Sequence, residues 1–408
     1  GALGNGNVDP YKFLPTMSID KTGVIVGDGQ VNYTSYPGLI PNNLTWEKVT
    51  TYDVGVDVDM FKNRLTIGFD WYRRNTTDMY TVGPTLPEVL GTTQPKGNYA
   101  NLKTKGWELI LSWRDNFKLA GSDFHYGVKF MLWDSQSWIT KYNNATGKLS
   151  DYYEGYRIGD IWGYNIEGLF TSYDEIANHA DQDYIKISDS KIWQPGDLKF
   201  ADLNGDGKID KGAQTLSDHG DLVIVGNEEE RYHYGFNLNV GWKGIGISAF
   251  FQGVGKRDWY PGQETGFFWG KYNRPYGYSL KMHENRWTEE NPNPNAYWPR
   301  LVGYSSENGG RPMGTPNNRY MQDASYLRLK ALTVDYSLPQ AWVSKLGLTG
   351  LKIYFTGENL FTFSNICENF DPEVIKGGDV DLKDRKGEEQ GYSYPMLKTY
   401  TVGLNVSF

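Results

Sequence analysis

The last nine residues of the chain alternate strictly between apolar and polar or small side chains. The apolar members are Tyr400, Val402, Leu404, Val406 and Phe408. A period of two residues with one apolar face is typical of a half-buried β-strand. The chain is therefore expected to end in a strand whose apolar face lies against a core or a membrane.

Eight segments upstream alternate in the same way, so that about nine strands are predicted. They lie at residues 52–59, 65–71, 107–113, 126–132, 234–242, 245–251, 325–339 and 351–363. This pattern predicts an all-β chain. It does not by itself separate a membrane barrel from a soluble β-sandwich, because sandwich strands alternate too.

The links between these segments alternate in length. Short or modest links are expected at residues 60–64, 114–123, 242–244 and 338–350, and long ones at 76–98, 139–229, 258–324 and 364–394. Outer-membrane barrels have short periplasmic turns and long extracellular loops, whereas Greek-key sandwiches have no reason to keep this rhythm. The rhythm favours a membrane barrel and assigns Phe408 to the periplasmic side.

The composition agrees with a barrel, argues against a nucleic-acid-binding protein and excludes a helical membrane protein. The net charge of −8 gives no reason to expect a nucleic-acid partner, and no apolar run approaches the ~20 residues of a transmembrane helix. Aromatic residues end several segments, among them Trp71, Trp113, Trp138 and Trp242. In a barrel they would form the aromatic girdles at the two membrane interfaces, and in a soluble protein they would be core residues.

Several stretches resemble, in order, the SusC/RagA type of TonB-dependent outer-membrane transporters. They are GNGNVDPYKF (4–13), KGWELILSW (105–113), EGYRIGDIWGYNIEGLF (154–170), PGDLKFADLNGDGKID (195–210), YGFNLNVGWKGIGISAFFQGVGKRDW (234–259), SYLRLKALTVDYSLP (325–339), IYFTGENLFTFSN (353–365), FDPEV (370–374) and the closing segment. As an ordered set spanning nearly the whole chain they are highly specific.

The resemblance implies a large antiparallel transmembrane β-barrel of 22 strands that holds an N-terminal plug. It also implies coupling to the TonB complex, a SusD-like surface lipoprotein as a lid, and import of glycan or peptide oligomers across the bacterial outer membrane. The plug and its TonB-contacting segment are not recognised here, and no signal peptide is visible at the start. Residues 1–408 are therefore expected to be the C-terminal barrel part of a longer transporter, and the rest of that transporter is an expected partner.

The segment DLNGDGKID matches the first half of a calcium-binding loop. The candidate ligands are Asp202, Asn204, Asp206, the carbonyl of Lys208, Asp210 and, by analogy with the resembled family, Asp221. Calcium is expected ahead of magnesium, in a structural role. The alternative is a metal-free turn whose side chains cap local backbone groups.

The predicted loop 258–324 is rich in aromatic residues. Trp259, Trp269, Trp287 and Trp298 are candidates for contact with a sugar ring or a peptide. The alternative is that these bulky side chains pack the loop itself.

No catalytic residues are expected. The five histidines show no metal-site spacing, and neither a nucleophile elbow nor a phosphate-binding loop is present. A soluble surface protein that binds carbohydrate with calcium-stabilised loops is the second reading. A glycoside hydrolase is a distant third, since no pair of carboxylates stands out among the 49 acidic residues.

Overall fold

The computed structural model describes most of the chain. The described residues are 2–3, 14–40, 44–83, 89, 94–185, 192–262, 265–272, 277–301, 314–375 and 393–408. The resembling stretch 4–13 lies outside them. None of the helices in these ranges is long and apolar enough to cross a membrane.

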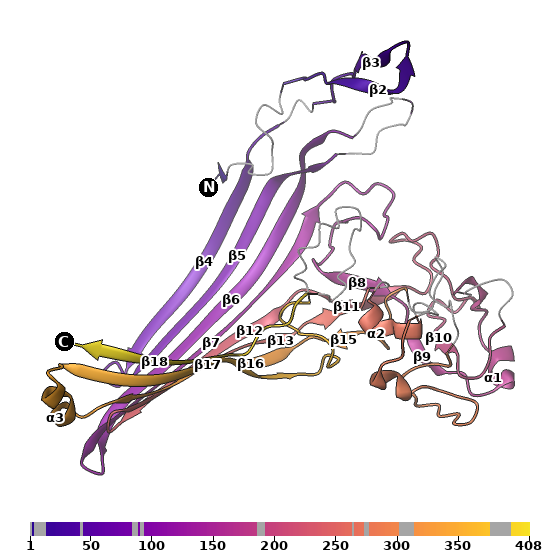
Figure 1. Cartoon of the computed structure of the whole chain (residues 1–408). Helices are drawn as coiled ribbons and strands as arrows, with labels where there is room; N and C mark the ends of the chain where they lie inside the picture. The colour runs from indigo at the N-terminus through magenta and orange to yellow at the C-terminus, as the bar shows by residue number, and fades with distance from the viewer. Residues whose placement is uncertain are drawn as a thin grey trace.

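One antiparallel sheet dominates the molecule (Figure 1). Its strands are, in spatial order, β1 (Ala2–Leu3), β4 (Glu47–Met60), β5 (Leu65–Val82), β6 (Lys96–Leu119), β7 (Ser122–Lys141), β12 (Arg231–Trp242), β13 (Ile245–Lys256), β16 (Tyr326–Ser337), β17 (Gly350–Ser364) and β18 (Thr399–Ser407). Each of the nine predicted segments overlaps one of the nine long strands. The prediction of an all-β, antiparallel, partial barrel is confirmed.

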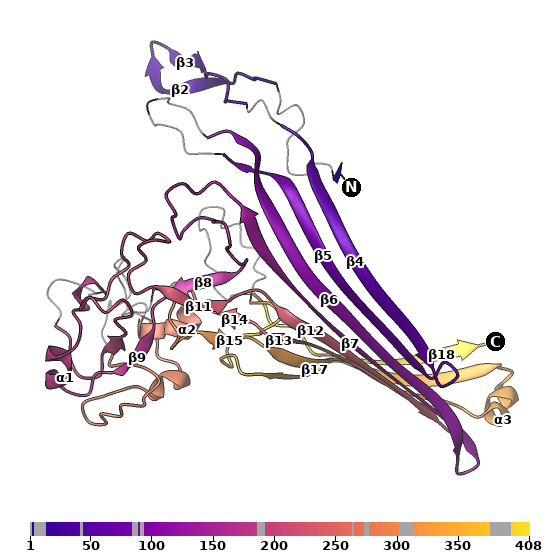
Figure 2. The ribbon, with the colours of Figure 1, turned by 180° about the vertical axis from the view of Figure 1, so that it is seen from behind.

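The sheet is a single curved layer (Figures 1 and 2). The other described sheets have only two strands each, so no second sheet packs against the large one to form a sandwich. The soluble sandwich is therefore wrong for the described part of the chain.

Several strands continue beyond their alternating apolar cores. β5 ends at Val82 and β6 begins at Lys96, at the end of the sheet where the long loops emerge. The connection between them therefore has 13 residues and is shorter than the predicted loop 76–98. At the other end the predicted link 114–123 is only a two-residue turn at Ala120 and Gly121, whose φ values are 50° and 75°. Positive φ at both positions matches the twist of a tight hairpin. The alternation of apolar and polar residues identifies only the part of a strand that has an apolar environment on one side. It does not identify the polar residues that extend the strand at either end.

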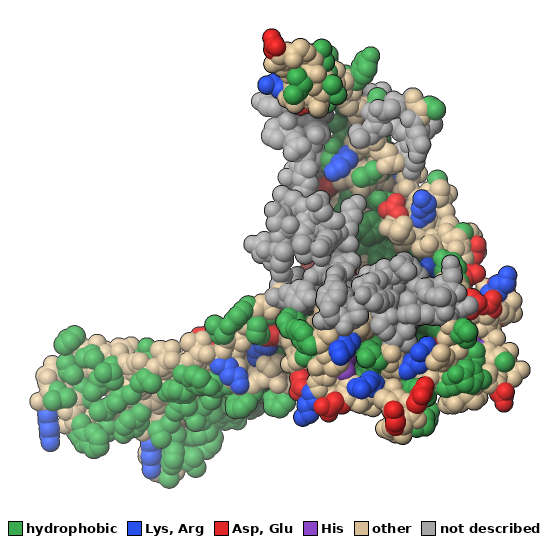
Figure 3. All heavy atoms as spheres, turned by 45° about the vertical axis from the view of Figure 1, so that its right-hand side comes forward, with side chains coloured by type: hydrophobic (Ala, Val, Ile, Leu, Met, Phe, Trp, Pro, Cys, Tyr) green, Lys and Arg blue, Asp and Glu red, His purple; other side chains and the backbone are tan. Residues whose placement is uncertain are grey.

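One face of the sheet is apolar across all nine long strands. Every second side chain of three segments lies on this face: Tyr52 to Met60, Leu65 to Trp71 and Trp107 to Trp113. The residues paired with them on successive strands lie on the same face, as far as Tyr400–Phe408 on β18. Many of these side chains are exposed, and Figure 3 shows a broad apolar surface over the arm of the molecule that holds the short-turn ends of the strands. The opposite face carries Asp57, Glu108, Lys129, Asn237, Thr333 and other polar groups.

Small residues let bulky side chains lie flat on the polar face. A Cβ on Gly403 would lie 2.3 Å from the ring of Tyr354 on the neighbouring strand. A Cβ on Gly106 would lie 2.4 Å from the ring of Tyr72. Glycine is required at both positions because the ring of the adjacent strand occupies the space that a Cβ needs.

The short turns and the end of the last strand lie together at one end of the sheet (Figure 1). Helix α3 (Gln340–Val343) and the 3-10 helix η5 (Ser344–Leu346) link β16 to β17 there, and the Thr349 N–H donates to Ser407 O over 2.8 Å. The long loops emerge at the other end. A separate hairpin of β2 (Ile19–Val26) and β3 (Gly29–Thr34) projects beyond that end.

The long loops contain short elements. They are β8 (Asp160–Gly163), β9 (Ile166–Leu169), α1 (Tyr173–Ala177), η2 (Asp183–Ile185), β10 (Leu198–Phe200), β11 (Val223–Asn227), β14 (Asp258–Trp259), α2 (Gly266–Trp269), η3 (Gly270–Tyr272), η4 (Lys281–Glu284) and β15 (Gln322–Asp323). β8 pairs with β11, β9 with β10 and β14 with β15.

Candidate functional site

Three long loops fold together into one body with its own core, here called the loop body. Its buried residues come from the β7–β12 connection (the first loop), the β13–β16 connection (the second loop) and the β17–β18 connection (the third loop). They include Phe200, Trp298 and Phe370. Long loops without a core would be mobile, so this shared burial is what fixes their shape.

Trp298 is at the centre of this core. Its ring stacks on Tyr272 at 5.0 Å and on Tyr320 at 5.2 Å between centroids, and His283 meets it edge-on at 4.7 Å. Its indole N–H donates to Met282 O over 3.0 Å, which satisfies the one polar atom of the side chain.

An aromatic contact, an ion pair and a close approach of a ring to a glycine join the loops to one another. Trp259 packs on Phe370 at 4.9 Å and so joins the second loop to the third. Arg300 and Asp197 join the second loop to the first through an ion pair of 2.6 Å. The ring of Trp287 lies where a Cβ on Gly196 would be, and Gly196 has a φ of +90°.

The structure places all four candidate substrate-binding tryptophans in the core. Trp259 and Trp269 are each 2% exposed, Trp298 is 0% exposed and Trp287 is 8% exposed. In this conformation they have no surface to offer a ligand. Their placement matches the alternative stated from the sequence, in which they pack the loop, and a role in substrate contact stays a prediction.

The predicted calcium loop is a network of turns. Asp202 accepts hydrogen bonds from Gly205 N–H (2.7 Å) and Gly207 N–H (2.9 Å). Asn204 Oδ1 accepts from Asp206 N–H, and Asp206 Oδ1 accepts from Lys208 N–H. These are side-chain caps of local backbone groups, as in the metal-free alternative.

Asp221 closes this loop, as the resemblance implied, but through the backbone. It is 1% exposed. One carboxylate oxygen accepts from Leu203 N–H (2.7 Å) and the other from Asp210 N–H (2.9 Å). Asp210 in turn accepts from Gly212 N–H.

Within the described ranges, no three acidic, histidine or cysteine side chains converge as a metal site requires. Calcium binding, and magnesium as its alternative, stay predictions from the sequence.

A charged junction fastens the third loop to the sheet. Arg328 on β16 is 3% exposed, and its guanidinium donates to Glu373 Oε2 and to Asp371 Oδ1, each over 2.6 Å. It also donates to Thr362 Oγ1 on β17 over 2.8 Å, and Lys330 adds an ion pair to Glu373 at 2.8 Å. A guanidinium with three acceptors is well compensated for its burial.

Arg257, the residue directly after β13, reinforces the junction. It is 1% exposed, donates to Pro372 O over 3.1 Å and pairs with Glu230 at 3.1 Å. The segment that holds Asp371, Pro372 and Glu373 is thus fixed by two buried arginines, one on β16 and one directly after β13.

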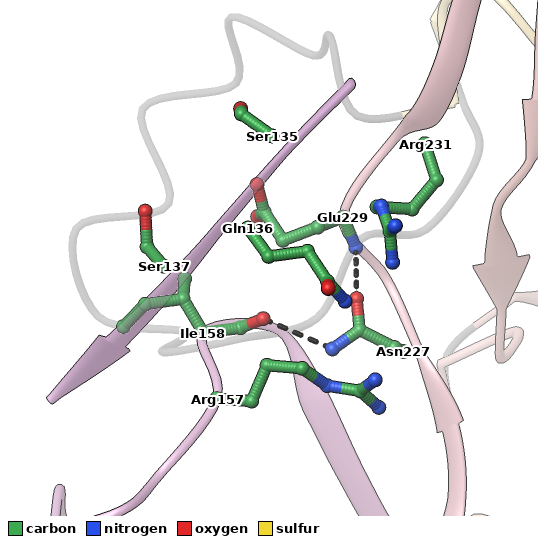
Figure 4. A pocket seen from close by; sticks show the side chains of 8 residues that line it. All are labelled: Ser135, Gln136, Ser137, Arg157, Ile158, Asn227, Glu229 and Arg231. Carbon is green, nitrogen blue, oxygen red and sulfur yellow. Dashed lines mark hydrogen bonds between the residues drawn. The ribbon is translucent and has the colours of Figure 1, made fainter. Parts of the chain in front are cut away.

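A polar pocket lies where β12 diverges from β7 (Figure 4). Its lining residues are Ser135, Gln136, Ser137, Arg157, Ile158, Asn227, Glu229 and Arg231. Asn227 is the hub, because its amide donates to Ile158 O (2.9 Å) and to Asp160 Oδ1 (2.8 Å), and its carbonyl accepts from Glu229 N–H (3.0 Å). The cavity of about 40 Å³ has room for a few water molecules.

Ion pairs set the charges of this pocket. Arg231 makes a two-pronged pair with the buried Asp134, and Arg157 pairs with Asp160 at 2.5 Å. Burial and the nearby Asp160 carboxylate raise the pKa of Tyr156 to about 12, and its hydroxyl donates to Asp160 O over 3.2 Å. A neighbouring cavity of about 240 Å³ shares Arg157, Asn227, Glu229 and Arg231 and adds Lys256 and Asp258.

Sequence reasoning did not single out these polar groups. Arg157 and Arg328 belong to stretches quoted for the resemblance, and so do Asp371 and Glu373, but no spacing rule joins residues so far apart. A usable signal is the pair of cations Arg328 and Lys330, which alternate with leucines near the start of their strand segment, since charges that become buried need partners.

Comparisons with known proteins agree with the fold. No family model matches the chain. TonB-dependent receptor P3 of Formosa agariphila is 28% identical over 100% of this chain and 38% of its own length. TonB-dependent receptor SusC of Bacteroides thetaiotaomicron is 24% identical over 100% of this chain and 37% of its own length.

Among solved structures, the RagAB peptide transporter matches 99% of this chain and 40% of its own chain, with a TM-score of 0.67 and 22% identity. The same importer in its open-open state gives a TM-score of 0.68 over 99% of this chain and 39% of its own. The chain thus spans about two fifths of the length of the relatives it matches. With its one-sided apolar sheet and its long loops, the chain is similar over its whole length to proteins named TonB-dependent receptors, SusC among them, and it shares the fold of the matched part of the RagAB transporter.

Proposed function

We propose that the chain is part of a transporter that imports a nutrient oligomer, a glycan or a peptide, across the outer membrane with energy supplied through TonB. One observation carries the proposal: the apolar face continues over nine strands while the reverse face stays polar. This arrangement suits a wall between lipid and a water-filled lumen. The relatives that match the whole chain are named as TonB-dependent receptors, and RagAB is named as a peptide transporter.

The chemistry of the loop end favours binding and passage of a polar cargo. The larger cavity of about 240 Å³ beside the pocket of Figure 4 is lined by guanidinium, amide and carboxylate groups, which pair with sugar hydroxyls and with peptide groups alike. Neither class of oligomer is favoured by this chemistry alone.

The loop body supports a second part of the proposal, a SusD-like lipoprotein as a lid. It is one body joined by Trp259–Phe370 and Arg300–Asp197, so it presents a fixed surface on which a lid can seat. A rigid surface loses less conformational entropy on association than separate loops do.

The test is an uptake assay in cells that make the intact transporter. Labelled oligosaccharides form one arm and labelled oligopeptides the other, each in cells with and without TonB and with and without the lid protein. TonB-dependent uptake in one arm is expected. Uptake that is unchanged by deletion of the transporter, in both arms, would overturn the proposal.

A further inference from the structure

Three cations stand together at the loop end of the apolar face. Arg73 on β5 is directly opposite Lys105 on β6, and Lys103 is the next residue of β6 on that face. No register shift separates Arg73 from Trp71, or Lys105 from Trp107, so these cations share a face with the apolar side chains. Arg73 and Lys105 are exposed.

Their position coincides with the upper limit of the apolar surface. Trp71 and Trp107 are paired directly with each other one step nearer the membrane centre. Paired tryptophans next to the apolar surface are typical of the interface with lipid headgroups. Because the long loops lie on this side, the interface is that of the outer leaflet.

The sheet does not neutralise these charges. Cβ atoms directly opposite each other in an antiparallel pair are about 5 Å apart, and like charges there are destabilising. Within the described residues, none of the three cations forms a salt bridge. The carboxylates at this end of the strands are engaged, since Asp134 is bound by Arg231 and Asp78 lies 3.4 Å from Lys48.

The remaining contacts orient the cations. Arg73 Nε donates to Asn75 Oδ1 over 3.3 Å. The Lys103 ammonium lies 5.5 Å from the ring centre of Trp138, the residue opposite it on β7. Gln136, opposite Lys105, adds an uncharged amide to the same surface.

We propose that Arg73, Lys103 and Lys105 bind the phosphate of an outer-leaflet lipid headgroup, whose acyl chains lie along the apolar face below Trp71 and Trp107. A phosphate between the strands replaces the repulsion of like charges by charge-assisted hydrogen bonds. Clusters of lysine and arginine at a membrane surface are the usual means of holding anionic headgroups. The site serves the membrane boundary and does not depend on the nature of the cargo.

The test measures lipid retained by the intact, detergent-purified transporter in native mass spectrometry. The probes are phosphatidic acid, diacylglycerol with the same acyl chains, and sodium phosphate. The unmodified protein is expected to retain phosphatidic acid in preference to diacylglycerol. The combined variant Arg73→Gln, Lys103→Gln, Lys105→Gln is expected to retain it on the order of 100-fold more weakly.

The matched control removes the same charge at the short-turn end, through Lys118→Gln, Lys243→Gln and Lys345→Gln, and is expected to retain phosphatidic acid normally. Equal retention of both lipids by the unmodified protein would overturn the proposal, and so would equal loss in the control. Displacement of the lipid by sodium phosphate at equal concentration would assign the cations to a free anion instead. Uptake is not part of the readout, so the result is independent of the proposed import.

Discussion

Met60 and Tyr400 lie on the same row of directly paired residues, although Met60 ends the apolar face of β4 and Tyr400 begins that of β18. The row passes from Met60 through Leu65, Trp113, Val128, Leu238, Ala249, Leu332 and Gly357 to Tyr400. The apolar face therefore shifts by about one residue per strand. One residue of about 3.3 Å for each strand spacing of about 4.8 Å corresponds to a tilt of about 35°, as in membrane barrels.

The tilt sets the depth of each β18 residue in the membrane, and this depth determines how much a charged side chain there lowers the free energy of unfolding. Leu404 is midway between Tyr400 and Phe408, and Leu404→Arg is expected to lower the free energy of unfolding by about 2–4 kcal/mol. The measurement is reversible unfolding of the intact transporter in lipid vesicles.

Two controls accompany Leu404→Arg. Tyr400→Arg, at the interface, is expected to cost about 0–1 kcal/mol, and Asn405→Arg places the same charge on the polar face. Equal costs at Leu404 and Asn405 would contradict the assignment of the two faces.

Gly403 is expected to tolerate no side chain while Tyr354 is present. The Cβ of Gly403→Ala would lie 2.3 Å from the Tyr354 ring, and overpacking of this kind costs about 1–3 kcal/mol. In a double-mutant cycle, Tyr354→Ala should remove most of that cost. Gly127→Ala on β7 is the matched control, since its nearest neighbour is Trp113 O at 3.8 Å.

Arg328→Met is expected to release the third loop from the sheet. It leaves Asp371 without its guanidinium and Glu373 with Lys330 only, and loss of one partner from a buried ion pair costs about 3–5 kcal/mol. Amide hydrogen exchange should increase at Phe370 and Glu373. Lys352→Met, which removes a more exposed ion pair to Asp335, is expected to have little effect. Unchanged exchange at Glu373 in the Arg328 variant would argue against the junction.

Asp221→Ala is expected to loosen the loop that begins at Asp202, because the N–H groups of Leu203 and Asp210 lose their acceptor. Each unsatisfied N–H costs about 1–3 kcal/mol. Limited proteolysis should show faster cleavage between residues 202 and 221. Asp174→Ala on α1 is a control at another acidic position of the same loop.

Calcium binding by the loop that begins at Asp202 is tested by calorimetry. Calorimetric titration of the chelator-treated transporter with calcium chloride should release or absorb heat and slow that cleavage. No heat and unchanged protease sensitivity would leave the side-chain caps as the only stabilisation of the loop.

His283 predicts a dependence of the loop body on pH. Its Nε2–H donates to Phe268 O (2.7 Å) and its Nδ1 accepts from Leu280 N–H (2.9 Å), so the buried ring is neutral. Burial lowers the pKa of His283, so the unfolded loop binds a proton more readily than the folded one. Stability is therefore full above about pH 6.5 and decreases as the pH falls below it. Exchange protection of Trp298 between pH 7.5 and pH 5 measures this, and His283→Gln should flatten the profile.

The sequence was sufficient for the sheet and insufficient for the loops. Alternation located all nine long strands, because a strand between lipid and water repeats its environment every two residues. The core around Trp298 is different, since its members come from three loops with no common period. Composition alone marks the tryptophans of these loops, and it does not show that the neighbours of Trp259, Trp269 and Trp298 are other aromatic side chains.

The separate core of the loop body has a consequence for how such proteins diverge. Membrane thickness constrains the apolar face strand by strand, whereas Trp298 and its neighbours hold the loops together without reference to the bilayer. Substitutions in the loops are thus expected to be tolerated by the sheet, because the core around Trp298 does not include the lipid-facing side chains. The sheet and the loop body, although interleaved along one chain, are therefore held by two separate sets of contacts.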